Sequence, residues 1–166
     1  MAGVRKVPAA QEHAAPVTPA RIAKALAARG YVTQTMGGVV SGAWDGFDVT
    51  IRLEHVDSLP GGPDDGLEDS AQPSFMVLEA RWGIAIPQDM RSALHLALND
   101  WNREQLWPTG VLTPRGEGWT ALARYAADTA DGLSDGQLLA TLDIALRGSI
   151  SLLKNLGKPE RRLEDG

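Results

Sequence analysis

The stretch GGVVSGAWDGFDVTIRLE, residues 37–54, decides the fold class. Gly37-Gly38 and Asp45-Gly46 are strong two-residue hairpin signals, because the favoured hairpin turns require residues that tolerate a positive φ. From Phe47 to Leu53 apolar and polar residues alternate strictly, which is typical of an antiparallel strand with one face in water. The stretch therefore predicts neighbouring antiparallel strands joined by short turns.

Helical patterns surround this strand-rich block. The first runs over residues 18–30, with Thr18 as its cap; the second runs from Pro87 to about Gln105. The third begins at Ser134, which forms an S-x-x-Q capping box with Gln137. Strand patterns cover residues 31–36, 39–44, 47–56, 74–84, 106–114 and 118–126. The order is helix, three or four strands, helix, two strands, helix, which predicts an α+β fold with a mostly antiparallel sheet and helices on one face.

The length of 166 residues and the composition, 43% hydrophobic and 22% charged, fit one globular domain. Residues 1–17 are rich in Ala and Pro and predict a flexible tail. Residues 18–156 form the predicted domain, and residues 157–166 form a charged tail.

The formal net charge of −5 makes a nucleic-acid phosphate backbone an unfavourable partner. The chain has no cysteine, so disulfides, thiolate zinc sites and cysteine nucleophiles are excluded. No window approaches the ~18 consecutive apolar residues of a membrane span. These features lead us to expect a cytoplasmic protein.

Residues that could carry chemistry are sparse. His13, His55 and His95 stand in no metal-binding or catalytic motif. The acidic loop 57–73 offers oxygen ligands for calcium, yet it lacks the order of an EF-hand, and a solvated insertion explains it. The sequence therefore predicts no enzyme, no metal and no cofactor.

The segment LNDWNREQLWPTG, residues 98–110, is the best candidate for a binding site. Trp107 follows the helix and precedes Pro108; it either anchors a partner peptide or pins the helix end onto the sheet. Asn99 and Asn102 share a polar strip with Arg91 and His95. Their amides either orient a partner segment or bond the strand that follows the helix.

The last helix carries more apolar surface than one sheet contact requires. Leu139, Ile144 and Ile150 fall outside its inner stripe, and we predict that they form a homodimer contact. Asp143 and Arg147 are spaced to pair on the polar side.

Three segments carry a resemblance to a known family: ARGYVTQT, LNDWNREQLWPTGVL and DTADGLSDGQLLATLDIALRGSISLLKNL. With the N-x-x-N at the end of the middle helix, they resemble the YbjN family of bacterial sensory transduction regulators over about residues 18–156. The resemblance implies the fold of type III secretion chaperones, whose relatives bind peptides or partner proteins and often dimerise. It implies no catalytic residues.

Together these observations predict a non-enzymatic protein- or peptide-binding module, regulatory or chaperone-like, that forms a homodimer. Trp107, Asn99 and Asn102 would contact the partner. The alternative is a small-molecule-binding domain or an enzyme of unrecognised type, with a pocket near His95.

Overall fold

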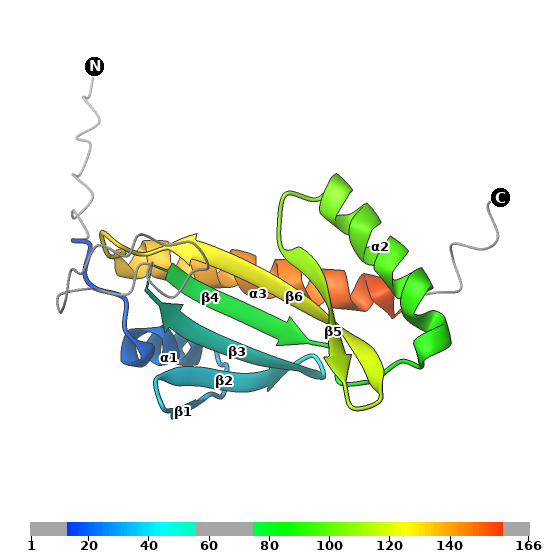
Figure 1. Cartoon of the computed structure of the whole chain (residues 1–166). Helices are drawn as coiled ribbons and strands as arrows, with labels where there is room; N and C mark the ends of the chain where they lie inside the picture. Colours follow the sequence, from blue (N-terminus) through cyan, green and yellow to red (C-terminus); the bar gives the residue numbers. More distant parts are fainter. Residues whose placement is uncertain (1–12, 56–74, 158–166) are drawn as a thin grey trace, which may run out of the picture.

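The computed structural model describes residues 13–55 and 75–157. The acidic loop 57–73 and most of both predicted tails lie outside these residues. The described chain forms, in order, α1 (Pro19–Ala28), β1 (Gln34–Met36), β2 (Val39–Trp44), β3 (Phe47–Glu54), β4 (Phe75–Arg81), the 3-10 turn η2 (Gln88–Met90), α2 (Arg91–Glu104), β5 (Thr109–Arg115), β6 (Gly118–Asp128) and α3 (Asp135–Leu156) (Figure 1). The α+β class and the order of elements are confirmed.

The strands form one six-stranded antiparallel sheet in the order β1-β2-β3-β4-β6-β5. The two predicted hairpins are present: Gly37-Gly38 joins β1 to β2, Asp45-Gly46 joins β2 to β3, and all four residues have positive φ. Because β6 pairs with β4, strand β5 is left at the edge of the sheet, with α2 inserted before it.

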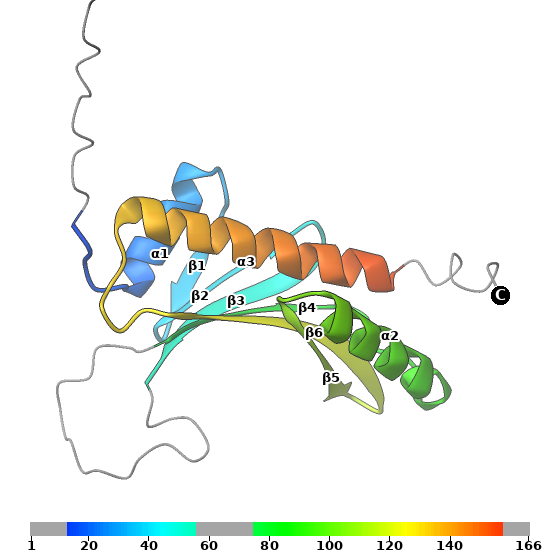
Figure 2. The same cartoon turned by 90° about the horizontal axis from the view of Figure 1, so that it is seen from above.

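The three helices cover one face of this sheet. Figure 2 shows α1 and α3 on the same side, with α3 running lengthwise along β4 and β6. A Cβ on Gly110 of β5 would meet both Leu98 of α2 and Leu152 of α3, so α2 lies on that face as well. The core between the layers is made of fully buried side chains such as Ile22, Ile51 and Leu142. The predicted arrangement of helices on one face is confirmed.

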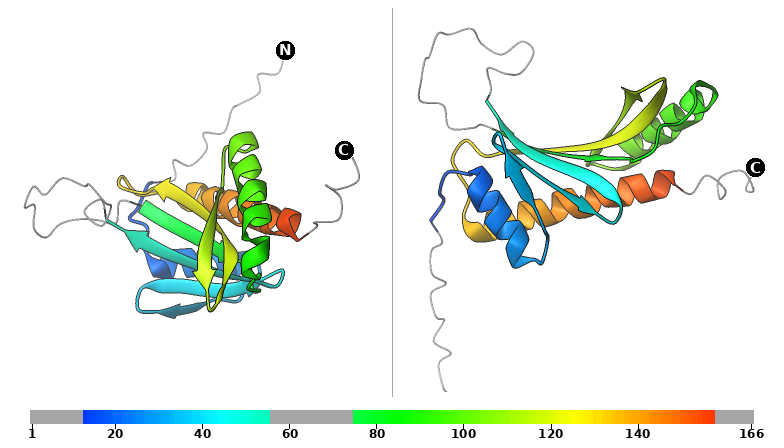
Figure 3. Two further views of the ribbon diagram at one scale, coloured as in Figure 1. Left: turned by 45° about the vertical axis from the view of Figure 1, so that its right-hand side comes forward. Right: turned by 90° about the horizontal axis from the view of Figure 1, so that it is seen from below.

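The opposite face of the sheet is concave, and no helix of the described residues covers it (Figure 3). Its centre holds Glu79, only 7% exposed, which pairs with Arg52 and Arg124 from the strands on either side. Burial alone would raise the pKa of Glu79, but hydrogen bonds and Coulombic attraction from the two arginines lower it below the usual value. The carboxylate is therefore charged, and its oxygens are engaged in ion pairs that link neighbouring strands.

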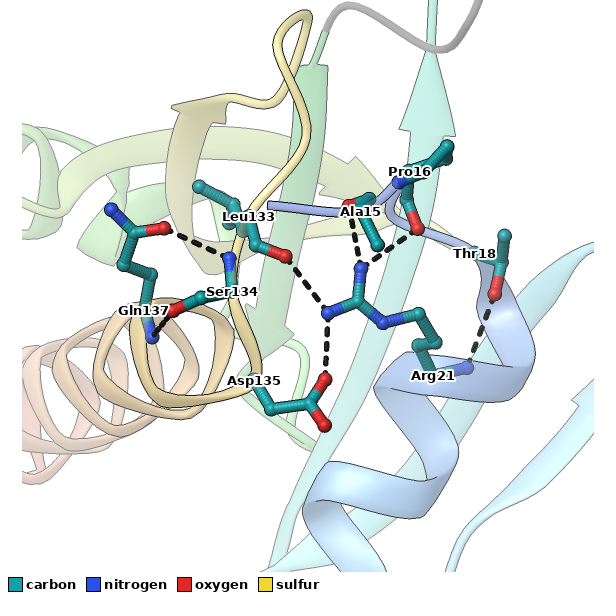
Figure 4. A network of polar contacts seen from close by, with 8 residues as sticks. All are labelled: Ala15, Pro16, Thr18, Arg21, Leu133, Ser134, Asp135 and Gln137. Carbon is teal, nitrogen blue, oxygen red and sulfur yellow. Dashed lines mark hydrogen bonds and ion pairs between the residues drawn. The ribbon is translucent and has the colours of Figure 1, made fainter. Parts of the chain in front are cut away.

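One arginine connects the start of the described chain to the start of α3 (Figure 4). Arg21 donates hydrogen bonds to the carbonyls of Ala15, Pro16 and Leu133, and its guanidinium is 2.7 Å from Asp135 Oδ1. Beside it, Ser134 and Gln137 form the predicted capping box, which is confirmed. The interactions of Arg21 thus fix the first turn of α3 against α1.

Two details differ from the sequence analysis. Val17, placed in the tail, is buried in the core, and Ala15 forms a bridge with Leu133, so the ordered part begins before Thr18. The predicted pairing of Asp143 with Arg147 is wrong, because Asp143 pairs at 2.7 Å with Arg29, which caps the C-terminal end of α1. The i,i+4 spacing within α3 does not show that the end of α1 lies beside Asp143 and supplies the arginine instead.

We predict that Arg21→Gln returns the pKa of Asp135 to its ordinary range. The hydrogen bond and charge of Arg21 hold that pKa below its usual value. The pair therefore stabilises the fold above the ordinary aspartate pKa, and this contribution is lost as the pH falls through the lowered value. NMR titration of the Asp135 carboxyl carbon measures the shift. Arg29→Gln, which removes the arginine at the end of α1 that pairs with Asp143, is the control and should leave the pKa of Asp135 unchanged.

We also predict that Ser149→Ala raises the free energy of unfolding by about 1 kcal/mol, because an unpaired buried hydroxyl is costly. Ser149 is fully buried on α3, and its Oγ has no hydrogen-bond partner among the described residues. Chemical denaturation compares it with Ser151→Ala, an exposed position of the same helix that shares the change in helix propensity. A larger loss of stability for Ser149→Ala than for Ser151→Ala would contradict the prediction.

Candidate functional site

The end of α2, residues 105–108 and the start of β5 form a junction held by two side chains. Asn102 Nδ2 donates to the Gly110 carbonyl at 2.9 Å, and the Gly110 N–H donates to Asn102 Oδ1 at 2.7 Å. A residue in an antiparallel sheet exchanges the same pair of bonds with its neighbour. The amide of Asn102 therefore takes the place of a further strand beside Gly110.

The second attachment is made by Trp101. Its indole N–H donates to the Pro108 carbonyl at 2.9 Å. This bond ties residues 105–108 to α2. Pro108 is buried against α3, where a Cβ on Gly148 would stand 3.1 Å from its Cδ. The glycine thus allows the connection to approach α3 closely.

This fixed connection presents two large apolar side chains outward. Leu106 is 83% exposed and Trp107 is 48% exposed. The Trp107 ring stands edge-on to Tyr125 of β6, with ring centroids 6.3 Å apart and an interplanar angle of 88°. Burial raises the pKa of Tyr125. Part of the Trp107 ring therefore packs against the sheet, as expected if it pins the end of α2. The rest of the ring is exposed, as expected if it anchors a partner.

The structure separates the three apolar residues assigned to α3. Ile150 packs against the core, and Leu139 is half-buried, whereas Ile144 is 45% exposed. At 3.6 residues per turn, Ile144 lies about 120° around the helix from Ile150 and about 140° from Leu139. Ile144 lies one helical turn before Gly148, the position of α3 that faces Pro108. We call the exposed side chains of Leu106, Trp107 and Ile144 the junction patch.

On the other side of Asn102, α2 and β5 border a hollow. It has a volume of about 270 Å³ and is lined by Arg91, His95, Leu98, Asn99, Gly110, Val111, Leu112 and Trp119. The Arg91 guanidinium lies 4.3 Å from the centroid of the Trp119 ring, a cation–π distance. Trp119 is held in turn by a 2.6 Å hydrogen bond from its indole N–H to Gln88 Oε1. We call this hollow the α2–β5 groove.

The structure thus brings Arg91, His95 and Asn99 together along the groove, as the predicted polar strip, but gives Asn102 a different position. Its amide is engaged with Gly110, which supports the interpretation that it bonds the following strand. Sequence reasoning missed Trp119 and Gln88, which reach the groove only through the pairing of β6 with β5 and the course of η2. No local spacing signals such a contact.

The remaining candidates form no comparable site. His55 follows β3, with its Nδ1 buried and unpaired within the described residues. Across residues 13–55 and 75–157, no group of three or more His, Cys, Asp or Glu side chains is placed to hold a metal ion. In the same ranges, no helix is long and apolar enough to cross a membrane. The acidic loop 57–73, interpreted from the sequence as a solvated insertion, lies outside them.

The family model of YbjN, described as "Putative bacterial sensory transduction regulator", matches residues 75–152. The matched region runs from β4 into α3 and includes the whole junction and the groove. The resemblance to this family stated from the sequence is confirmed.

A solved structure shares the fold. The crystal structure of YbjN from E. coli, described as "a putative transcription regulator", matches with a TM-score of 0.63 at 12% identity, covering 87% of this chain and 96% of that chain. An uncharacterized protein from Methanothermobacter thermautotrophicus matches with a TM-score of 0.46 at 10% identity, covering 86% and 98%. No curated protein matches the chain. The likeness to type III secretion chaperones stays a prediction.

We predict that Asn102→Ala lowers the free energy of unfolding by about 1–2 kcal/mol, because both backbone groups of Gly110 lose their partner. Asn99→Ala is the matched control: Asn99 lies on the same helix, is exposed, and makes no hydrogen bond through its side chain within the described residues. Chemical denaturation of both variants measures the difference. Equal losses would show that the Asn102 bonds contribute nothing to stability.

Proposed function

We propose that this chain is a cytoplasmic regulatory module that acts by binding protein rather than by catalysis, and that it forms a homodimer. The regulatory part follows the description of the matched family. The observation that carries the binding part is the junction patch, where exposed apolar side chains stand on a rigidly held connection. A protein rather than a nucleic acid is the proposed partner, because the net charge is −5.

The patch has the properties of a binding anchor. A tryptophan offers a large contact area and an N–H donor while losing little side-chain freedom. Trp107 is restricted further by its edge contact with Tyr125. Because residues 105–108 are tied to α2 and α3, little entropy remains to be lost when a partner binds.

A second copy of the chain is the partner that we propose for this patch. A twofold interface uses the same surface on both subunits, so Trp107 of one copy could cover Ile144 of the other. Both sides of such a contact are apolar and about half-exposed. Leu139 and Ile150, which the sequence assigned to the contact, lie on another flank of α3 and would support it only indirectly.

We predict that the protein elutes at twice its chain mass in size exclusion coupled to light scattering. Ile144→Asp and Trp107→Ala should each shift it to a single mass, because each removes apolar surface from the patch. Leu96→Asp is the control: Leu96 is 63% exposed on the outer side of α2 and should leave the dimer intact. Circular dichroism shows that each variant is folded. A parent that remains a monomer at high concentration would refute the homodimer.

A further inference from the structure

Strand β5 is an edge strand, and of its three outward-facing positions only one keeps both backbone groups free. Gly110 directs its N–H and C=O away from β6, since both bond Asn102. Outward and inward pairs alternate along an antiparallel strand, so Leu112 and Pro114 face the same way as Gly110. Proline has no N–H to offer. Leu112 is thus the one position of this edge that presents both a donor and an acceptor.

The α2–β5 groove opens at this position. Arg91, His95 and Asn99 follow one another at four-residue intervals on α2, so they share one side of the helix. That side lines the groove together with Leu112 and Trp119. The side chains of all three polar residues make no hydrogen bond or ion pair within the described residues. Their donors face a hollow rather than a protein partner.

Arg91 supplies a positioned charge at one end of the groove. Its guanidinium is stacked on Trp119, whose ring is fixed by Gln88, so the cation is oriented, and no carboxylate of residues 13–55 and 75–157 pairs with it. Trp119 pairs with Pro114, and Asn102 binds Gly110. The charge therefore lies toward the Pro114 end, and the Asn102 amide closes the other end.

We infer that the α2–β5 groove binds the C-terminal residues of a partner polypeptide, with the free carboxylate on Arg91. This inference rests on the proposed protein-binding function but uses a surface separate from the junction patch. In a parallel arrangement the last residue donates its N–H to the Leu112 carbonyl. The carbonyl two residues earlier accepts from the Leu112 N–H, and the terminal carboxylate continues toward Arg91.

A chain end fits this site better than a strand that runs through it. Pairing can extend for only one residue of β5, since Asn102 occupies Gly110 and Pro114 lacks a donor. A strand that continued past Leu112 would leave its next backbone groups unpaired. A chain that ends there has no further groups to pair, and its carboxylate gains an ion pair with Arg91. His95 and Asn99 lie where they can donate to the peptide backbone, and the half-buried Leu112 and Trp119 offer an apolar surface for its side chains.

The test uses twenty N-terminally fluorescein-labelled hexapeptides of sequence GSAAVX, which differ only in the last residue, each as the free acid and as the C-terminal amide. Fluorescence anisotropy with the full-length protein measures the dissociation constants. We expect some acids to bind at least about tenfold more tightly than their amides, because charge-assisted hydrogen bonds are about twice as strong as neutral ones. Arg91→Gln should abolish that difference, whereas Arg81→Gln, at an exposed arginine of β4, should preserve it.

NMR provides a second readout that does not depend on Arg91. The Leu112 amide resonance should shift on titration with a binding acid, since its N–H gains an acceptor. Acids and amides that bind equally, or a selectivity for acids that survives Arg91→Gln, would overturn the inference. So would the absence of binding by all forty peptides. The proposed homodimer is judged separately from the light-scattering mass, so a dimer that ignores every peptide refutes the groove and not the proposed function.

Discussion

The reciprocal hydrogen bonds between Asn102 and Gly110 hold together the end of the molecule that carries the candidate site. They join the last turn of α2 to the start of β5, and they occupy backbone groups of the sheet edge that could otherwise recruit another chain. With this pair in place, residues 105–108 span a short distance, and Pro108 is bonded to Trp101 and packs closely on Gly148. The junction patch and the groove lie on either side of that one pair.

The helix α3 connects this junction to the rest of the fold. It spans 22 residues, packs on β4 and β6, and meets Pro108 at Gly148, while its first turn is bound to α1 and the preceding chain through Arg21. One rigid element therefore touches both ends of the structure. The charged triad of Glu79, Arg52 and Arg124 on the open face ties β3, β4 and β6 together from the other side. The sheet is thus held from both faces although helices cover only one.

Features that depend on neighbouring residues could be predicted from the sequence. The glycine turns, the Thr18 cap and the Ser134 capping box are local, and each is present. The bonding of the strand by Asn102 was foreseeable because β5 follows its helix directly. The contacts of Arg29 with Asp143, 114 residues apart, and of Arg91 with Trp119 were not, since they depend on which elements the fold places side by side. Helical periodicity likewise grouped Leu139, Ile144 and Ile150 as surplus surface without showing that they lie on different flanks.

The composition of the junction suggests how one small region could serve two partners. Its patch is apolar and suits a flat, self-complementary contact, whereas its groove combines a cation, polar donors and one free backbone pair, which suit a directional ligand. Because the bonds of Trp101 and Asn102 hold the elements that carry the patch and the groove, neither requires the chain to refold on binding. In a dimer built through the patch, the groove of each copy would remain on the far side of Asn102 and open to a peptide. A regulator of this design would present two equivalent grooves, so a partner with two chain ends would gain from simultaneous engagement.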